Sequence, residues 1–467
     1  MKPKRPFPSG RTANRAIRWS SSTMHAAWRR ARGTPGRDML AAGVRRGAIG
    51  TEHPSIPTSR PLPAPSVGAT AQATRQADIG PPRRVAQVFH DDRYGGPAKR
   101  VCSASGKLLR EGYRDVLFFP PWGGNGPQIA ARLGLEVRTV KIHKAAHPRR
   151  ILAFARWVVG LPVDILRFHK AYRQADIDLV VVNAPFNVAP AIAAWLSGLP
   201  LVWYLNDTLL PRRAAALYGS LMALLASRVV AQGQALAAHY GLRPDQYDCI
   251  YSHVDTDIFS PGPALVEDGT TGTVGILANW SWMKGYDHFI EACAQVRRRW
   301  RGRLSIIMAG ARLATQEQYC GKVDDLIERH DLTGDIQELG FVNTPQDLIR
   351  RFTILVMASR TGDACPNVVL EAMASGVPVV ATAVGCVQEL IEQDREIGPA
   401  GIVVPAGEPD RLADAIFRIL DDPRLARTMA ANGRLRALRY FNTQAYIDRH
   451  VALFNAMLRP SRCERNR

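Results

Sequence analysis

"ILVMASRTGDACPNVVLEAMASGVPVVAT" (354–382) contains an apolar run, a loop, a helical pattern and a second apolar run. The two outer runs, rich in Val, Ile, Leu and Ala, are typical of strands whose two faces are both covered in a parallel sheet. Between them, Pro366 suits the first turn of a helix, and Gly376 suits its left-handed end. The stretch is therefore predicted to be a strand–helix–strand unit, from which doubly wound α/β sheets are built.

The same unit repeats along the chain in two series. The first series starts at Val85, and its strand runs are "VAQVFHD", "DVLFF", "VRTVKI", "DIDLVVVNA", "LPLVWYL", "RVVAQ" and "YDCIYS". The strand runs of the second are "TVGILAN", "LSIIMAG", "DIQELGF", "ILVMAS", "VPVVAT" and "GIVVP". Two such series predict two Rossmann-like doubly wound domains, 85–262 and 263–440, joined near a polar segment with Gly and Pro. The strand ends would face a shared cleft, and a last helix in 441–467 would pack back on the first domain.

Net charge and cysteine content limit the function classes. The formal charge is +20, but residues 1–84 hold 16 Lys and Arg against 3 Asp and Glu, so +13 of it lies there. The mildly basic remainder makes nucleic acid a poor candidate partner. Seven scattered cysteines without a C-x-x-C pair suit a reducing compartment, and we expect a cytoplasmic protein without a spanning helix. With no C-x-x-C pair in the sequence, no metal site is expected.

The segment 1–84 is rich in Arg, Pro, Ser and Ala and has hardly any aliphatic run. Such a composition cannot bury enough apolar surface to offset its ordering entropy, so the segment is predicted to be a disordered basic tail. It suits a transit-like or membrane-attracted arm, or results from an upstream start codon, since Met24 and Met39 both lie within it.

Two carboxylates flank the start of the helix in the opening stretch. Asp363 lies in the loop before the helix and Glu371 on its second turn. A helix N-terminus at a cleft offers N–H groups to a phosphate, and carboxylates accept hydrogen bonds from vicinal sugar hydroxyls, so the pattern suits a nucleotide sugar. The alternative is that Asp363 caps the helix and Glu371 is a solvated helix residue.

Several motifs resemble glycosyltransferase family 4, whose retaining members have the GT-B fold. The stretch "GDACPNVVLEAMASGVPVVATAVGCVQELI" resembles the donor-binding signature, an acidic residue followed seven residues later by Glu. "NWSWMKGYDHFIEA" resembles the segment with the diphosphate-binding Lys, and "GFVNTPQDLIRRFTILVMAS" resembles the segment that lines the base. "YSHVDTDIFSP" resembles the stretch between the domains, and "GEPDRLADAIFRILDDPRLARTMAANGR" the C-terminal helices. The similarity is extensive over 250–450 and only general over 85–250.

The resemblance assigns roles to individual residues. It implies that Glu371 binds the donor ribose, Asp363 binds the donor sugar, and Lys284 neutralises the departing diphosphate. These three are the expected catalytic residues; Lys284 taken alone would otherwise be an ordinary solvated surface charge. The donor site expected from the resemblance also includes Gly95, Gly96, Asn279, Phe341, Cys365, Pro366, Asn367 and Val368. Gly-Gly after a strand is also common in ordinary tight turns.

Some positions depart from the family pattern. The first acid is usually Glu and is Asp363 here, and the Arg that commonly stands five residues before the Lys is Asn279. The usual His–Asp after the "PLV" strand is Asn206–Asp207, and "VVAQGQAL" lacks the familiar Ser. These departures bear on the acceptor side more than on donor binding.

The resemblance implies a hexosyltransferase-type enzyme. It would move a sugar, with retention of configuration, from a nucleoside-diphosphate sugar to a glycan or lipid-linked acceptor, in cell-surface polysaccharide or glycolipid biosynthesis. It would need no metal and no cofactor other than this co-substrate. Two alternatives stay open: a non-catalytic nucleotide-sugar-binding or scaffold protein, and another two-Rossmann-domain enzyme such as a sugar-nucleotide epimerase or a phosphorylase.

The segment 147–173 combines apolar residues with flanking Arg and Lys. This pattern suits an interfacial helix that would bring the protein to the inner face of a membrane as a peripheral protein. It equally suits an ordinary amphipathic helix with one buried face. Pro162 is expected to kink or split this helix.

Overall fold

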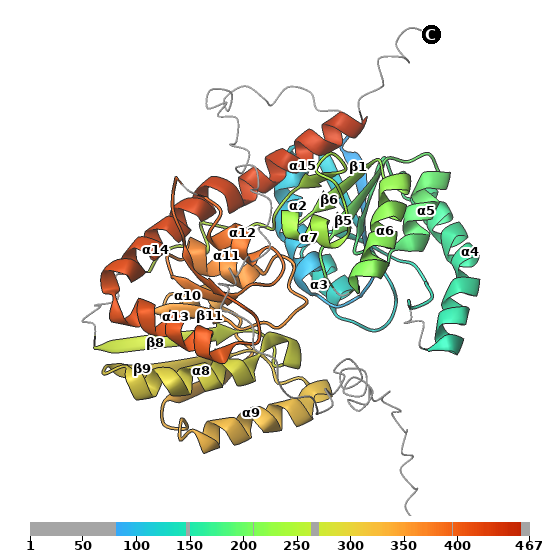
Figure 1. The fold of residues 1–467 in the computed structure, drawn as a ribbon. Helices are drawn as coiled ribbons and strands as arrows, with labels where there is room; N and C mark the ends of the chain where they lie inside the picture. Colours follow the sequence, from blue (N-terminus) through green and yellow to red (C-terminus); the bar gives the residue numbers. More distant parts are fainter. Residues whose placement is uncertain (1–80, 146–149, 209, 263–269, 395, 459–467) are drawn as a thin grey trace, which may run out of the picture.

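The structure is a computed structural model that describes residues 81–145, 150–208, 210–262, 270–394 and 396–458. Two parallel β-sheets form two domains that lie side by side (Figure 1). The first sheet has the order β3-β2-β1-β4-β5-β6-β7 and the second the order β10-β9-β8-β11-β12-β13. The strands are β1 Arg83–Phe89, β2 Tyr113–Phe119, β3 Glu136–Thr139, β4 Leu179–Asn183, β5 Leu201–Leu205, β6 Arg228–Ala231, β7 Tyr247–Cys249, β8 Thr271–Leu277, β9 Arg303–Ala309, β10 Ile336–Gly340, β11 Ile354–Met357, β12 Val379–Thr382 and β13 Gly401–Val404.

Helices follow almost every strand, as the sequence pattern predicted. Those of the first domain are α2 Gly96–Arg110, α3 Gly126–Arg132, α4 Ile151–Gln174, α5 Val188–Leu196, α6 Arg212–Leu225 and α7 Gln234–His239. Those that follow are α8 Tyr286–Arg299, α9 Glu317–Arg329, α10 Pro345–Ile349, α11 Asn367–Ala374, α12 Val387–Ile391, α13 Pro409–Asp421, α14 Pro423–Arg436 and α15 Thr443–Leu458, with short turns η1 Trp282–Lys284, η2 Ala314–Gln316 and η3 Ala437–Phe441. The two predicted doubly wound domains are therefore present.

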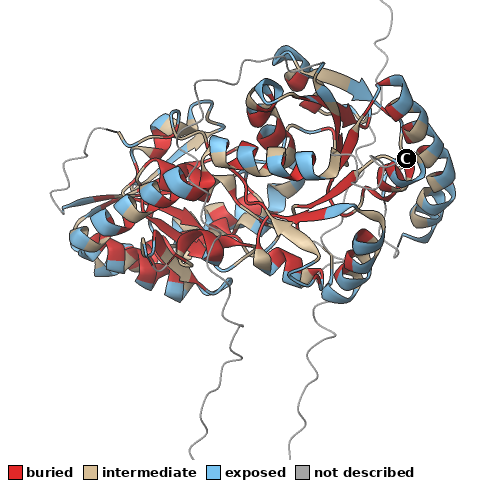
Figure 2. Cartoon of the chain, turned by 90° about the horizontal axis from the view of Figure 1, so that it is seen from above, coloured by how far each residue is buried: buried red, intermediate tan, exposed pale blue. Residues whose placement is uncertain are grey.

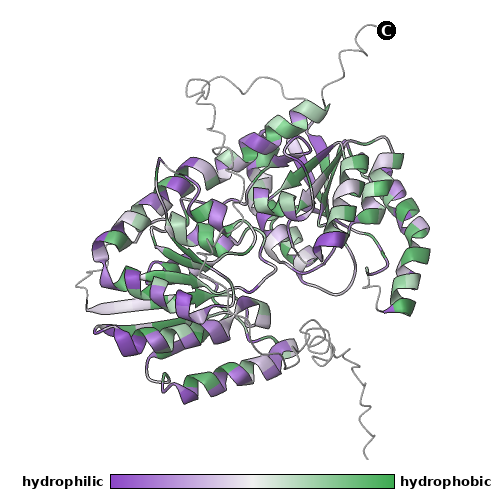
Figure 3. Ribbon diagram, in the orientation of Figure 1, coloured by the Kyte–Doolittle hydropathy of each residue, from purple (hydrophilic) through white to green (hydrophobic). Residues whose placement is uncertain are grey.

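The central strands are buried on both faces. Every residue of β4 and β5 is buried, including Trp203, because helices cover both sides of the sheet. Figure 2 shows the buried residues concentrated in the two sheets and on the inner sides of the helices, and Figure 3 shows the matching apolar colour of the strands. In each sheet the strand order reverses once, between β1 and β4 and between β8 and β11. Ligands of such sheets bind at this reversal, beyond the carboxyl ends of the strands.

The chain passes between the domains twice, and the two crossings touch. Val254 N donates to Phe441 O at 2.8 Å, which joins the first crossing to the second. After the second crossing, α15 lies against the first domain (Figure 1), where Tyr113 Oη donates to Asn455 Oδ1 at 2.8 Å. Phe454 is fully buried there. A second link joins the domains near α7, whose backbone N–H groups of Gln234 and Ala235 donate to the Glu389 carboxylate of α12.

Some expectations need correction. The tail was predicted to extend to residue 84, but Arg83 and Arg84 already belong to β1; residues 1–80 lie outside the described part. Pro366 was placed in the first helical turn, whereas it is the extended residue just before α11, with φ −71° and ψ 118°. Proline suits that position equally, because its ring permits this φ.

Helix α4 is continuous through Pro162, which was expected to kink or split it. Its later turns anchor it, because Phe168 and Tyr172 are buried against Phe118 of the first sheet. The proline removes one backbone hydrogen bond on an exposed side, where water can replace it. None of the described helices is both long and apolar enough to cross a membrane.

Candidate functional site

The loop after β11 and the helix α11 that follows form the centre of the candidate site. They lie at the strand reversal of the second sheet, next to the loop after β8 that carries Lys284. The start of α11 is anchored to the first interdomain crossing: Ser252 Oγ donates to Asn367 Oδ1 at 2.7 Å, and Ser252 N donates to Cys365 Sγ at 3.4 Å. The side chains of Cys365 and Asn367 therefore fix the helix to the hinge between the domains.

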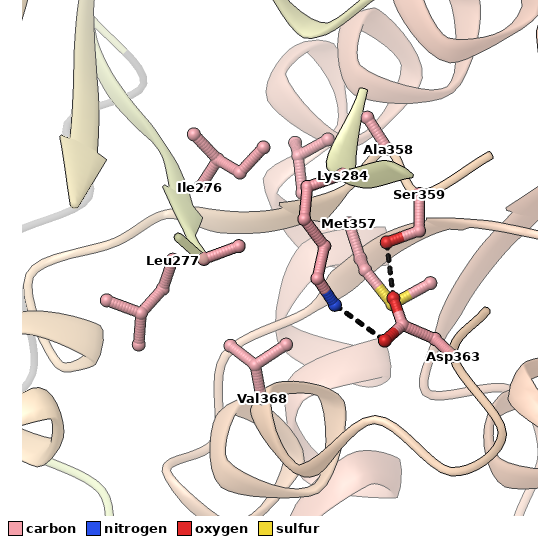
Figure 4. A pocket seen from close by; sticks show the side chains of 10 residues that line it. Ile276, Leu277, Lys284, Met357, Ala358, Ser359, Asp363 and Val368 are labelled. Carbon is pink, nitrogen blue, oxygen red and sulfur yellow. Dashed lines mark hydrogen bonds and ion pairs between the residues drawn. The ribbon is translucent and has the colours of Figure 1, made fainter. Parts of the chain in front are cut away.

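Lys284 and Asp363 form an ion pair (Figure 4). Lys284 Nζ lies 2.5 Å from Asp363 Oδ1, and Ser359 Oγ donates to Asp363 Oδ2 at 2.5 Å. Both carboxylate oxygens thus have partners, and neither is a backbone N–H of α11. Asp363 orients Lys284 at the entrance of the strand reversal, and it does not cap the helix.

A small cavity lies behind this ion pair. Lys284, Asp363, Val368 and Leu277 line it together with apolar residues from β8 and β11, and its volume is ≈ 20 Å³. This is room for about one water molecule. The cavity is therefore too small to hold a nucleotide.

Glu371 forms a second ion pair, with a residue of the other domain. Its side chain is only 8% exposed, and its Oε1 accepts a hydrogen bond from Lys99 Nζ of α2 at 2.9 Å. Burying a carboxylate this deeply requires a charged or hydrogen-bonding partner, which Lys99 supplies. The alternative that Glu371 is a solvated helix residue is wrong.

The other predicted donor residues lie around these pairs. Gly95 and Gly96 begin α2, one turn before Lys99, and a Cβ at either position would meet no atom within 4 Å, so this turn is open. Asn279 is exposed after β8, and its Oδ1 accepts from Ala311 N at 3.1 Å. Phe341 is 72% exposed after β10. The structure thus brings Lys284, Asp363 and Val368 to one cavity, and neither Asn279 nor Phe341 lines it.

Sequence reasoning missed three polar residues of the site. Lys99 neutralises Glu371, Ser359 holds Asp363, and Arg360 next to it pairs with Asp287 at 2.6 Å. The position of Lys99 in the first turn of a helix, three residues after Gly96, was the one available signal. Its partner could not be inferred, because Glu371 stands 272 residues further along the chain.

Gly285 fixes the position of Lys284. Its φ is +68°, and an added Cβ would lie 2.1 Å from the backbone oxygen of Ala358. We expect Gly285→Ala to destabilise the protein by about 2–4 kcal/mol and to move Lys284 away from Asp363. Thermal unfolding measures the effect.

The matched control is Gly321→Ala in α9, where a Cβ would meet nothing within 4 Å. This exchange should stabilise the protein by about 0.5–1 kcal/mol, because alanine favours a helix. An unchanged unfolding temperature in Gly285→Ala would show that the loop adapts and does not fix Lys284.

Two family models match the chain. "Glycosyltransferase Family 4" covers residues 94–258, and "Glycosyl transferases group 1" covers residues 269–422. This chain belongs to the family 4 glycosyltransferases. The matches cover every strand except β1 and include Lys99, Lys284, Asp363 and Glu371, so the two ion pairs lie inside the family domains of this glycosyltransferase.

Curated relatives and a solved structure agree with this assignment. The glycosyltransferase is 26% identical over 313 residues to the MMP alpha-(1->4)-mannosyltransferase of Mycolicibacterium hassiacum, covering 65% of this chain and 68% of that protein. It is 31% identical over 198 residues to the GDP-mannose-dependent alpha-(1-6)-phosphatidylinositol monomannoside mannosyltransferase of Mycobacterium tuberculosis, covering 39% of this chain and 48% of that protein. Anabaena Alr3699/HepE in complex with UDP has the same fold, with a TM-score of 0.66, 21% identity, and coverage of 80% of this chain and 100% of that one. The fold is GT-B.

Proposed function

We propose that this glycosyltransferase moves a hexose from a nucleoside-diphosphate sugar to a glycan or lipid-linked acceptor, with retention of anomeric configuration. The observation that carries the proposal is the pairing of Asp363 and Glu371 with lysines at the strand reversal. Carboxylates can hold sugar hydroxyls, and ammonium groups can stabilise a departing diphosphate. These groups together would meet both needs of sugar transfer.

Charge at the leaving oxygen is the main demand of this reaction. Lys284 and the N-terminal end of α11 would stabilise the negative charge that develops on the diphosphate. Ammonium groups at the site could supply the positive charge that a metal ion would otherwise supply, so we propose that the reaction needs neither a metal ion nor a further cofactor. Among the described residues no cluster of three or more His, Cys, Asp or Glu side chains is placed to hold a metal. Activity should persist in excess EDTA.

The names of the relatives indicate which sugar donors to test first. Two of them are named as mannosyltransferases, one of them GDP-mannose-dependent, and a neighbour of the same fold binds UDP. A panel should therefore begin with GDP-mannose and include UDP-glucose and other UDP sugars. Transfer to lipid-linked and glycan acceptors is measured by mass spectrometry, and the anomeric coupling of the product by NMR decides retention.

Glu371→Ala tests the site. Loss of a charged hydrogen bond to the ribose should weaken donor binding by about 10–100-fold and remove transfer. Binding is measured by calorimetry with the donor that the panel identifies. If the wild-type protein binds a donor but neither hydrolyses nor transfers it with any acceptor, it is a binding or scaffold protein instead.

A lipid-linked acceptor would require contact with a membrane surface. Helix α4 exposes an apolar face along its first four turns (green in Figure 3), consisting of Ile151, Leu152, Val158, Val159, Val163 and Leu166. Arg156, Arg167 and Lys170 are exposed on the same helix. We propose that this face lies on anionic lipid, since apolar contact and cationic attraction act together at such surfaces. Co-sedimentation with phosphatidylglycerol vesicles but not with phosphatidylcholine vesicles would support it, and no sedimentation with either would contradict it.

A further inference from the structure

We propose that Lys99 is the second cation of the donor diphosphate site, supplied by the opposite domain. The proposal rests on the function proposed above. It goes further in making the diphosphate a link between the domains, with Lys284 on one side and Lys99 on the other. The starting observation is the Lys99–Glu371 ion pair, which joins α2 of the first domain to α11 of the second.

The second domain alone lacks sufficient positive charge. Its donor site carries Lys284 against Asp363 and Glu371, one positive and two negative side chains. The two carboxylates would repel a diphosphate brought to such a site. This repulsion is strongest where water is partly excluded. Lys99 brings the sum of these four side chains to zero.

Other cations near the second sheet are committed elsewhere. Arg360 pairs with Asp287 at 2.6 Å and lies over the ring of Trp282. Arg312 pairs with Asp324 and with Glu338. Asn279 carries no charge, and its amide oxygen accepts the backbone N–H of Ala311. In the part of the chain that the structure describes, Lys284 and Lys99 are thus the cations that pair with Asp363 and Glu371.

Lys99 has hydrogen-bonding capacity to spare. An ammonium group has three N–H donors, and one of them is used by Glu371 Oε1. Within the described residues its side chain has no further hydrogen-bond partner, and it is 48% exposed. The adjacent turn at Gly95 and Gly96 leaves open space for a phosphate. Glu371 Oε2 accepts no bond from a described residue either, so the ribose could bind there while the Lys99 pair stays intact.

This arrangement couples donor binding to closure of the cleft. Opening the domains would separate Lys99 from Glu371 and from Lys284. A bound diphosphate would hold the two lysines on either side of it and so favour the closed arrangement. The hinge contacts of Ser252 with Asn367 and Cys365 do not involve Lys99, so they should persist when Lys99 is replaced. Thermal unfolding of each variant measures what the loss of the Glu371 partner costs.

Lys99→Met tests the proposal, because methionine keeps the length of the stem and removes the charge. We expect UDP and GDP to bind at least tenfold more weakly to the variant, measured by calorimetry, while uridine and guanosine bind within twofold of wild type. Lys99→Arg should restore most of the diphosphate affinity. Small-angle scattering should show that the diphosphate makes the wild-type protein more compact and leaves Lys99→Met unchanged.

The control is Arg110→Met, a charge removal on the exposed end of the same helix, which should bind UDP and GDP as wild type does. Equal or tighter diphosphate binding by Lys99→Met would overturn the proposal, because Lys99 would then only form an ion pair with Glu371 and would not bind the diphosphate. Equal weakening of nucleoside and diphosphate would also overturn it, since Lys99 would then act only by orienting Glu371. No binding of either diphosphate to the wild type would overturn it as well. Turnover is not used, so wild-type binding without transfer would refute the proposed function and leave this proposal standing.

Discussion

Replacing Lys284 with methionine is expected to lower kcat/KM for sugar transfer by about 10²–10³-fold. The ammonium group would stabilise negative charge that grows on the diphosphate as the glycosidic bond breaks, so its loss should fall mainly on kcat. Asp363 would be left without its cationic partner, and donor affinity should fall less than kcat. Steady-state rates with the identified donor give both parameters.

Two variants separate this effect from a general loss of charge. Lys322→Met removes an exposed lysine from α9 and should leave the kinetic parameters unchanged. Asp363→Asn removes the partner of Lys284 and keeps its ammonium, so it should lower the rate less than Lys284→Met. A Lys284→Met enzyme within threefold of wild type would rule out Lys284 as the group that stabilises the leaving diphosphate.

The sequence predicted both sheets because their strands are buried on two faces. Runs such as those around Val181 and Val380 are apolar throughout, which marks a covered parallel strand whatever its neighbours are. The helix after Pro366 was predicted from local signals as well, because proline and glycine restrict or extend the backbone at their own positions. Local chemistry was enough for these elements.

The contacts of the site could not be predicted in the same way. The motif indicated Asp363 and Glu371, but their partners depend on how loops and domains meet. Lys284 stands 79 residues before Asp363, and Lys99 lies in the other domain. No local pattern encodes these distances. Continuity of α4 through Pro162 likewise depends on packing of its later turns against the first sheet.

Acidification is expected to destabilise the region where α15 meets the first domain. His253 and His450 both pack on the ring of Tyr446, at 4.3 and 4.1 Å between centroids. Burial lowers the pKa of His253 to about 3 and the pKa of His450 to about 4. The neighbouring cations Arg100, Lys107 and Arg449 act in the same direction, because they disfavour an imidazolium ion.

The sign of the effect follows from proton binding. In the unfolded chain both histidines take up protons below about pH 6.5, whereas in the folded protein they stay neutral until much lower pH, so stability falls as the pH falls. Asp115 opposes this, because burial raises its pKa to about 6 and the folded protein binds that proton first. These three groups together contribute a loss of about 1.4 kcal/mol per pH unit between pH 6 and pH 4.

Urea unfolding at pH 7, 6, 5 and 4 measures this slope. His450→Gln removes one of the two histidines, and its amide can still donate toward the backbone oxygen of Tyr446, which now lies 2.9 Å from His450 Nδ1. The slope between pH 6 and pH 4 should therefore fall by about 1.4 kcal/mol per pH unit relative to wild type. His253→Gln should have the same effect at the other side of Tyr446. If both single variants lose stability with pH as steeply as the wild type, the acid sensitivity arises elsewhere, and α15 stays docked on the first domain at low pH.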